Sequence, residues 1–242
     1  MTTVVVLLAV GFTVYSLWVR RITWSCQWEI SATMTVAAMG LGMLLVCNAI
    51  NPFMDATLYQ VLHWRNIENL LGHVCMVFAA AGAVYVASSR VVRGTKRARI
   101  LRIWVNIPAG LSVIAMVATF AAGQATQLPT LYTDNVWMLA YQNIVASAVI
   151  YLLAVAAKML LIVRRDPRHN PTANIYLWAC IAGICGFGYR ASAITYFAPT
   201  PHTSLVAVGL IGLWVAGFAA AAAGSWQRKT RHLTVPPQPV RA

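Results

Sequence analysis

The sequence predicts an all-α protein, a polytopic bundle of seven transmembrane helices. Of the 242 residues, 60% are hydrophobic and only 10% are charged, and the mean hydropathy is +0.69. Soluble domains carry about 25% charged residues. The apolar residues also form long runs, and basic residues gather between alternate runs. Together these observations indicate an integral membrane protein.

The individual spans follow from the thickness of the bilayer. A hydrocarbon core of about 30 Å needs about 20 mainly apolar residues per helix. Runs of about this length occur at 3–19, 30–50, 67–88, 103–123, 136–163, 174–197 and 204–226. Arg20 and Arg21 follow the first run and no basic residue precedes it. The first run is therefore expected to stay in the membrane as an anchor rather than act as a cleaved signal peptide.

The distribution of basic residues predicts the orientation, because Lys and Arg near span ends are retained in the cytoplasm. Basic residues follow the first, third, fifth and seventh spans, whereas the opposite loops contain Arg65 alone. We therefore expect the N-terminus outside and the C-terminus in the cytoplasm of a bacterial plasma membrane. Residues 1–226 form the predicted membrane domain, and 227–242 form a basic, Pro-rich cytoplasmic tail. The formal charge of +13 then reflects topology and contact with anionic lipid head groups, without a nucleic-acid partner.

Features within the spans predict how the helices pack. Asn106 and Pro108 lie near the start of the fourth span, where a proline can leave backbone carbonyls to a neighbouring helix. Small residues recur every fourth position in the third and seventh spans, and such ridges let helices approach closely within the bundle or against another subunit. The two ridges consist of Ala79, Ala83 and Ala87, and of Gly212, Ala216, Ala220 and Gly224.

The stretch "VLHWRNIENLLGHVC", residues 61–75, is unusually polar for this chain. Asn66, Asn69 and His73 fall on one helix face by their spacing. His63 and His73 are too far apart along a helix, about 15 Å, to hold one metal ion, and no metal site is expected. The polar face is interpreted as a set of interhelical hydrogen bonds or as the lining of an outer vestibule.

Arg190, in "GFGYRASAITYF", lies about 10 Å below the outer end of the sixth span, where an unpaired charge is costly. Glu68 is the acidic residue expected to enter a helix on the same side. The sequence therefore predicts an ion pair between Arg190 and Glu68, assisted by Asn69, His73 and Tyr189. This predicted polar cluster is either a clasp between the third and sixth spans or part of a vestibule. A snorkelling Arg190 that reaches the head groups is a further alternative.

Signatures of catalysis are missing from the sequence, so we expect no enzyme and no catalytic residues. There is no GxSxG motif, no Gly-rich phosphate loop and no pair of membrane-embedded aspartates. A retinal protein would need a lysine in the last span, which contains none, and a transmembrane haem would need paired histidines. No cofactor is therefore expected.

Four sequence features carry a resemblance to a known group of proteins. They are the stretch Asn66–His73, the preceding "NAINPF", the basic connector "SSRVVRGTKRARILR" and "GFGYRASAI". With these features the chain resembles the seven-helix region of actinobacterial and actinophage integral membrane proteins that are labelled as candidate transporters. The resemblance implies a polytopic membrane protein connected with prophage or defence biology.

Two functional hypotheses follow. The first is a non-enzymatic membrane protein that acts in phage exclusion or envelope sensing through contact with a membrane-protein partner or a second copy of itself. The second is a transporter of a small solute or ion with an outward-facing polar vestibule. Transporters are commonly built from related halves or broken helices, and neither feature is evident in this sequence.

Overall fold

The computed structural model describes residues 1–25, 29–47, 57–60, 64, 66–89, 91, 95–125, 135–165, 170–196 and 201–234. The regular structure of these residues is entirely helical, which confirms the all-α prediction. The α-helices are α1 (Thr2–Val19), α2 (Ile30–Leu45), α4 (Ile67–Ser88), α5 (Thr95–Leu101), α6 (Ile107–Ala125), α7 (Val136–Val163), α8 (Asn170–Tyr196) and α9 (Pro201–Thr234). A 3₁₀ turn, η1 (Arg21–Ser25), follows α1, and a π-helical turn, η2 (Arg102–Asn106), joins α5 to α6.

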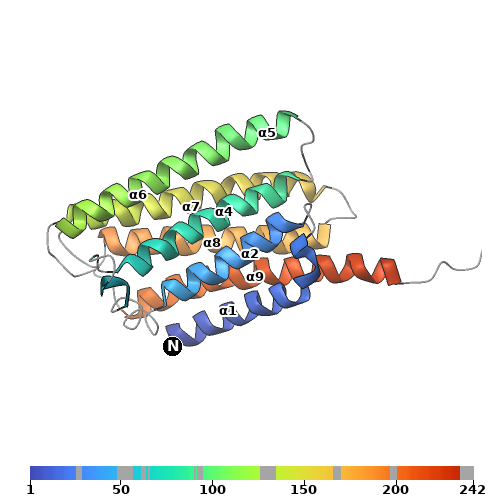
Figure 1. Cartoon of the computed structure of the whole chain (residues 1–242), viewed down its shortest axis with the longest axis horizontal. Coiled ribbons are helices and arrows are strands. Elements are labelled where there is room, and N and C mark those ends of the chain that lie inside the picture. Colours follow the sequence, from blue (N-terminus) through green and yellow to red (C-terminus); the bar gives the residue numbers. More distant parts are fainter. Residues whose placement is uncertain are drawn as a thin grey trace, which may run out of the picture.

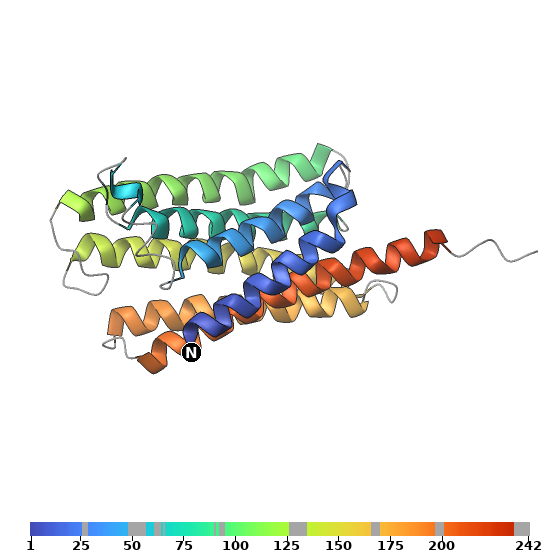
Figure 2. The ribbon, with the colours of Figure 1, turned by 60° about the horizontal axis from the view of Figure 1, so that its bottom comes forward.

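The long helices run back and forth along one axis of the molecule (Figure 1). In the order α1, α2, α4, α7, α8 and α9, each helix packs against the next, and α9 packs back against α1. Helix α6 lies outside this closed series, against α7 and α4 (Figure 2). The alternation brings the C-terminal ends of α1, α4, α7 and α9 together with the starts of α2, α5 and α8. We call this end of the bundle the basic end and the other the opposite end.

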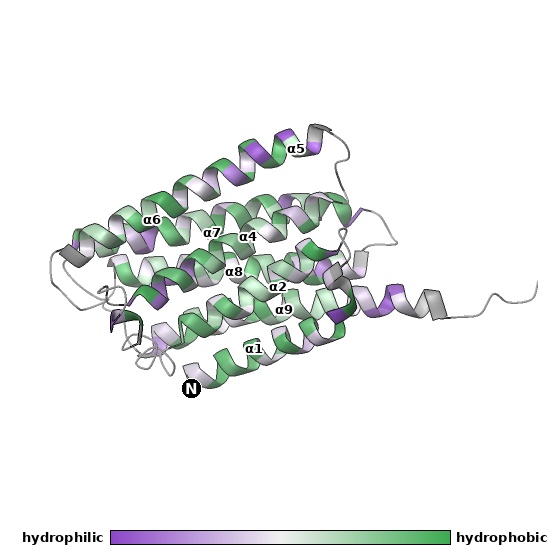
Figure 3. Cartoon of the chain, in the orientation of Figure 1, coloured by the Kyte–Doolittle hydropathy of each residue, from purple (hydrophilic) through white to green (hydrophobic). Residues whose placement is uncertain are grey.

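Apolar side chains cover the outside of the bundle. Leu8 on α1, Ile114 on α6, Trp178 on α8 and Leu213 on α9 are each between 61% and 69% exposed. Hydropathy colouring shows apolar residues along the long helices and polar ones on α5 and the end of α9 (Figure 3). Such a surface suits a hydrocarbon environment rather than water. The bundle is therefore compatible with a multi-pass membrane protein.

Six helices of the described chain are long and apolar enough to cross a membrane. They are α1, the continuous helix from α5 through α6, and α4, α7, α8 and α9, and they coincide with six of the seven predicted spans. Helix α2 is an apolar helix of 16 residues that ends at Leu45. Residues 48–50 of the predicted span 30–50 lie outside the described residues, so a seventh crossing stays a prediction.

The C-terminal helix is longer than the sequence predicts. The seventh span is predicted to end at 226, whereas α9 continues to Thr234. The first part of the predicted tail is therefore helical. The apolar run has ended there, and polar side chains contact other helices instead. Lys229 bonds to Glu29, and Arg228 donates to the Thr172 hydroxyl on α8. Residues 235–242 lie outside the described residues, and the domain boundary at 226 stays a prediction.

The proline in the fourth span has the predicted effect on its helix. Pro108 has no N–H to donate to the carbonyl of Trp104, four residues earlier. The backbone widens into the π-helical turn η2 just before the proline, and the Tyr151 hydroxyl on α7 donates to the Trp104 carbonyl at 3.1 Å. The side chain of Asn106 accepts a hydrogen bond from Tyr85 on α4 at 2.7 Å. Pro108 thus leaves a backbone carbonyl that accepts a hydrogen bond from the neighbouring helix α7.

Helices α2 and α4 cross closely at two glycines. A methyl group added to Gly42 would lie 3.0 Å from the carbonyl oxygen of Gly72, and one added to Gly72 would lie 2.6 Å from Cγ2 of Val46. The absence of side chains here is what permits the two backbones to approach. The ridge Ala79, Ala83 and Ala87 of α4 is also buried inside the bundle.

Candidate functional site

The predicted polar cluster lies at the opposite end of the bundle, on the first turns of α4. Helix α4 begins after Asn66, whose backbone adopts the left-handed conformation with φ 57°, which asparagine tolerates better than most residues. Glu68, Asn69 and His73 then face the bundle interior, with exposed fractions of 0%, 5% and 1%. Buried polar groups of this kind need partners from other helices.

The partners of His73 come from α7 and α8. The Arg190 guanidinium places Nη1 at 3.1 Å from Nε2 of His73, and the Tyr141 hydroxyl lies 2.7 Å from Nδ1 of the same ring. Arg190 is half-buried and Tyr141 is fully buried. We call Glu68, Asn69, His73, Tyr141 and Arg190 the His73 cluster.

The chemistry of these partners determines the protonation state of His73. An arginine side chain has no acceptor, so Nε2 must be the acceptor of the hydrogen bond from Arg190. The imidazole is then neutral with its proton on Nδ1, which donates to the Tyr141 oxygen. The cluster therefore holds a directed hydrogen-bond chain from the half-buried guanidinium through the imidazole to a buried phenol.

Aromatic rings surround the inner part of the cluster. Tyr141 packs at 5.5 Å from Phe120 between ring centroids, and Phe120 lies 6.2 Å from Trp64. The His73 ring meets Tyr141 edge to face. Because these rings exclude water from one side, the hydrogen bonds of His73 lie in a medium of low dielectric constant, where they are stronger than in water.

The predicted members of the cluster are brought together to different degrees. Asn69 donates to the Glu68 carboxylate at 3.4 Å, and Arg190 joins α8 to α4 through His73. The predicted ion pair between Glu68 and Arg190 stays a prediction. Tyr189 is 39% exposed, and its role also stays a prediction.

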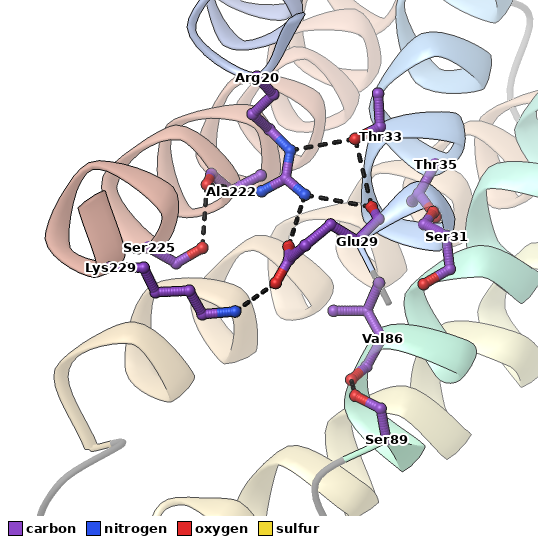
Figure 4. A network of polar contacts seen from close by, with 10 residues as sticks. All are labelled: Arg20, Glu29, Ser31, Thr33, Thr35, Val86, Ser89, Ala222, Ser225 and Lys229. Atoms are coloured by element: carbon purple, nitrogen blue, oxygen red, sulfur yellow. Dashed lines mark hydrogen bonds and ion pairs between the residues drawn. The ribbon is translucent and has the colours of Figure 1, made fainter. Parts of the chain in front are cut away.

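A second polar network, at the basic end, connects the first, second and last helices (Figure 4). Arg20 follows α1 and is completely buried. Its guanidinium donates to the Glu29 carboxylate at 2.8 Å, to the Thr33 hydroxyl at 3.2 Å and to the Ala222 carbonyl of α9 at 3.0 Å. Lys229 of α9 forms an ion pair with the other oxygen of Glu29. We call these five residues the Arg20 network.

The charges of the Arg20 network shift the pKa of Glu29, the residue that precedes α2. Burial alone would raise the pKa of this carboxyl group, but the hydrogen bonds and charges of Lys229 and Arg20 outweigh burial and lower the pKa from its ordinary value of 4.5. Glu29 is therefore ionised at neutral pH and holds two cations at once. In the sequence, Arg20 indicates only the orientation; the acidic Glu29 on the same predicted side of the membrane is the signal that could have indicated its partner.

Neither network supplies the ligand set of a metal site. Across the described residues, no three His, Cys, Asp or Glu side chains are close enough together to hold a metal ion. The His73 cluster offers the Arg190 guanidinium as a hydrogen-bond donor to acceptor oxygens, and it also contains the buried carboxyl group of Glu68. The Arg20 network satisfies its groups internally and connects three helices.

No protein-family model, no curated protein and no solved structure matches the chain. The resemblance to actinobacterial and actinophage membrane proteins therefore stays an expectation from the sequence.

Proposed function

We propose that the chain is a plasma-membrane protein that crosses the bilayer seven times, with its N-terminus outside and its C-terminus in the cytoplasm. The alternating helices support this proposal, because they direct the basic residues of the described chain other than Arg190 toward the basic end. That end would face the cytoplasm. The His73 cluster would then lie in the outer half of the bilayer.

The function that this geometry supports best is non-enzymatic binding of a small solute or ion from the outer side, as a first step of transport or reception. The observation that carries the proposal is the half-buried guanidinium of Arg190, held by a buried, neutral His73. Ionisable residues inside membrane helices are costly and commonly mark solute pathways. A guanidinium presents several N–H groups in one plane, an arrangement suited to a carboxylate or phosphate. A solute that carries such a group is the expected ligand.

Thermal unfolding of the purified protein tests this proposal. A ligand that binds only the folded state raises the melting temperature, and the rise grows with the free ligand concentration relative to the dissociation constant. A panel of small carboxylates and phosphates should contain members that stabilise the wild type and do not stabilise Arg190→Gln. Lys158→Gln, which removes an exposed charge at the basic end, is the matched control and should respond like the wild type. Equal responses of wild type and Arg190→Gln to every solute would refute the proposed site.

A second candidate function is contact with another membrane protein or a second copy, in phage exclusion or envelope sensing. The ridge on α9 supports it in part. Gly212 packs against Val5 of α1, whereas Ala220 is exposed and nothing lies within 4 Å of a methyl group built on Gly224. Close helix contact is favoured by such small residues. Ala220→Leu should then reduce co-purification of a partner and any protection against phages in plating assays, at unchanged expression.

A further inference from the structure

The two consecutive arginines after α1 have opposite environments. Arg20 points into the bundle and is completely buried in the Arg20 network. Arg21 is exposed, and its guanidinium lies over the face of the Trp18 ring, 4.7 Å from the ring centroid. Glu29, the acidic residue of this region, is already engaged by Arg20 and Lys229. The positive charge of Arg21 therefore faces outward.

Arg21 lies at the rim of a surface groove. The groove has a volume of about 400 Å³ and is lined by Val14, Leu17, Trp18, Arg21 and Trp24. Its walls are almost entirely apolar, and the residues Trp18 and Trp24 are 67% and 54% exposed. Indole rings at the ends of membrane helices lie at the level of the lipid head groups. The groove thus offers an apolar channel along α1 with a cation at the end where head groups would lie.

We propose that this groove binds one phospholipid with an anionic head group. The phosphate would contact the Arg21 guanidinium, and an acyl chain would lie along Val14 and Leu17 between the indole rings. Charge complementarity favours a lipid over an apolar helix of a partner, because a helix would leave the cation without a counter-charge. This site is independent of the solute site proposed at the His73 cluster, which lies at the opposite end of the bundle.

Melting-temperature titrations in neutral detergent test the proposal, with phosphatidylglycerol as the probe and phosphatidylcholine as the zwitterionic reference. Phosphatidylglycerol should stabilise the wild type at lower concentrations than phosphatidylcholine. Arg21→Gln should weaken the apparent affinity for phosphatidylglycerol about fivefold, the effect of one basic residue near a head-group surface. Arg99→Gln removes another exposed arginine, on α5 at the same end, and should retain wild-type affinity.

A second variant tests the apolar part of the site and covers the case in which Arg21→Gln folds poorly. Leu17→Trp keeps the cation and fills the groove, so it should also weaken the response to phosphatidylglycerol. Equal losses in Arg21→Gln and Arg99→Gln would overturn the proposal, because they would indicate diffuse attraction. Full retention of affinity by Leu17→Trp, or equal protection by soluble glycerol phosphate, would overturn it as well, since neither result requires an acyl chain in the groove.

Discussion

At the scale of single residues, the buried Arg20 is the side chain on which the stability of the basic end depends most. Its removal takes a hydrogen-bond donor from the Glu29 carboxylate and from the Ala222 carbonyl, which keeps the hydrogen bond from the Ser225 hydroxyl. Breaking a buried pair on one side costs about 3 kcal/mol. We therefore expect Arg20→Met to lower the free energy of unfolding by about this amount, measured by titration with denaturing detergent. The adjacent Arg21→Met should change it by less than about 0.5 kcal/mol, as for other exposed positions. Equal losses of stability in Arg20→Met and Arg21→Met would contradict the structural role of the Arg20 network.

Glu29 gives the Arg20 network a defined pH dependence. The native pKa of this carboxyl group is lowered, so its stabilising effect is complete above the ordinary value of 4.5 and is lost as the pH falls through the native pKa. The difference in melting temperature between wild type and Glu29→Gln should therefore be constant near neutral pH and should shrink below about pH 4.5. Thr33→Val, which removes no titratable group, serves as the control: its difference from the wild type should not shrink over the same range.

The tautomer of His73 is a direct spectroscopic test of the His73 cluster. Nitrogen NMR of protein with labelled histidine should find the proton on Nδ1, because Arg190 can only donate to Nε2. The signal is assigned by its loss in His73→Gln. Arg190→Met removes the donor to Nε2, so the imidazole proton should then be able to occupy Nε2. In Tyr141→Phe the imidazole proton should stay on Nδ1, because the Arg190 guanidinium still donates to Nε2. A proton on Nε2 in the wild type would contradict the hydrogen-bond chain.

The sequence predicted part of this cluster and missed another part for physical reasons. Arg190 stands out in an apolar span, and Asn69 and His73 share a helical face, so their association was predictable. Tyr141 was not found, because an aromatic residue inside an apolar run leaves the hydropathy pattern almost unchanged. The sequence indicated Arg20 only as an orientation signal. Its burial at the end of α1 depends on α9, because it contacts Ala222, which lies more than 200 residues later in the chain.

At the scale of the elements, the crossing of α2 and α4 depends on glycine. An added methyl group at Gly72 would lie 2.6 Å from Val46 and 3.1 Å from the Gly42 carbonyl oxygen. Gly72→Ala should therefore separate the helices and destabilise the protein by about 1–3 kcal/mol, as for other overpacked sites. Gly110→Ala on α6, where nothing lies within 4 Å, should be neutral or stabilising. Unfolding midpoints of the two variants make the comparison, and a neutral Gly72→Ala would contradict close contact.

Helix boundaries show where the sequence is sufficient and where it is not. The predicted ranges 67–88 and 136–163 agree with α4 and α7, since each apolar run is bounded by polar residues that also end the helix. Asn135 contributes to the second case, because its side chain accepts the backbone N–H of Trp137 and caps α7. The end of α9 was not predictable from hydropathy, because contacts of Arg228 and Lys229 with other helices accompany its last turns.

At the scale of the whole molecule, the number of crossings decides the topology. Helix α2 is short, but it begins at the basic end beside Arg20 and packs along α4, which is the direction that a seventh crossing requires; the crossing itself stays a proposal. Seven crossings place the termini on opposite sides of the membrane, whereas six would place them on the same side. A C-terminal fusion to a fluorescent protein that folds only in the cytoplasm should be fluorescent, and a short N-terminal epitope should be accessible to antibody on intact spheroplasts. An inaccessible N-terminal epitope together with a fluorescent C-terminus would place the two ends of the chain on one side, and would contradict seven crossings.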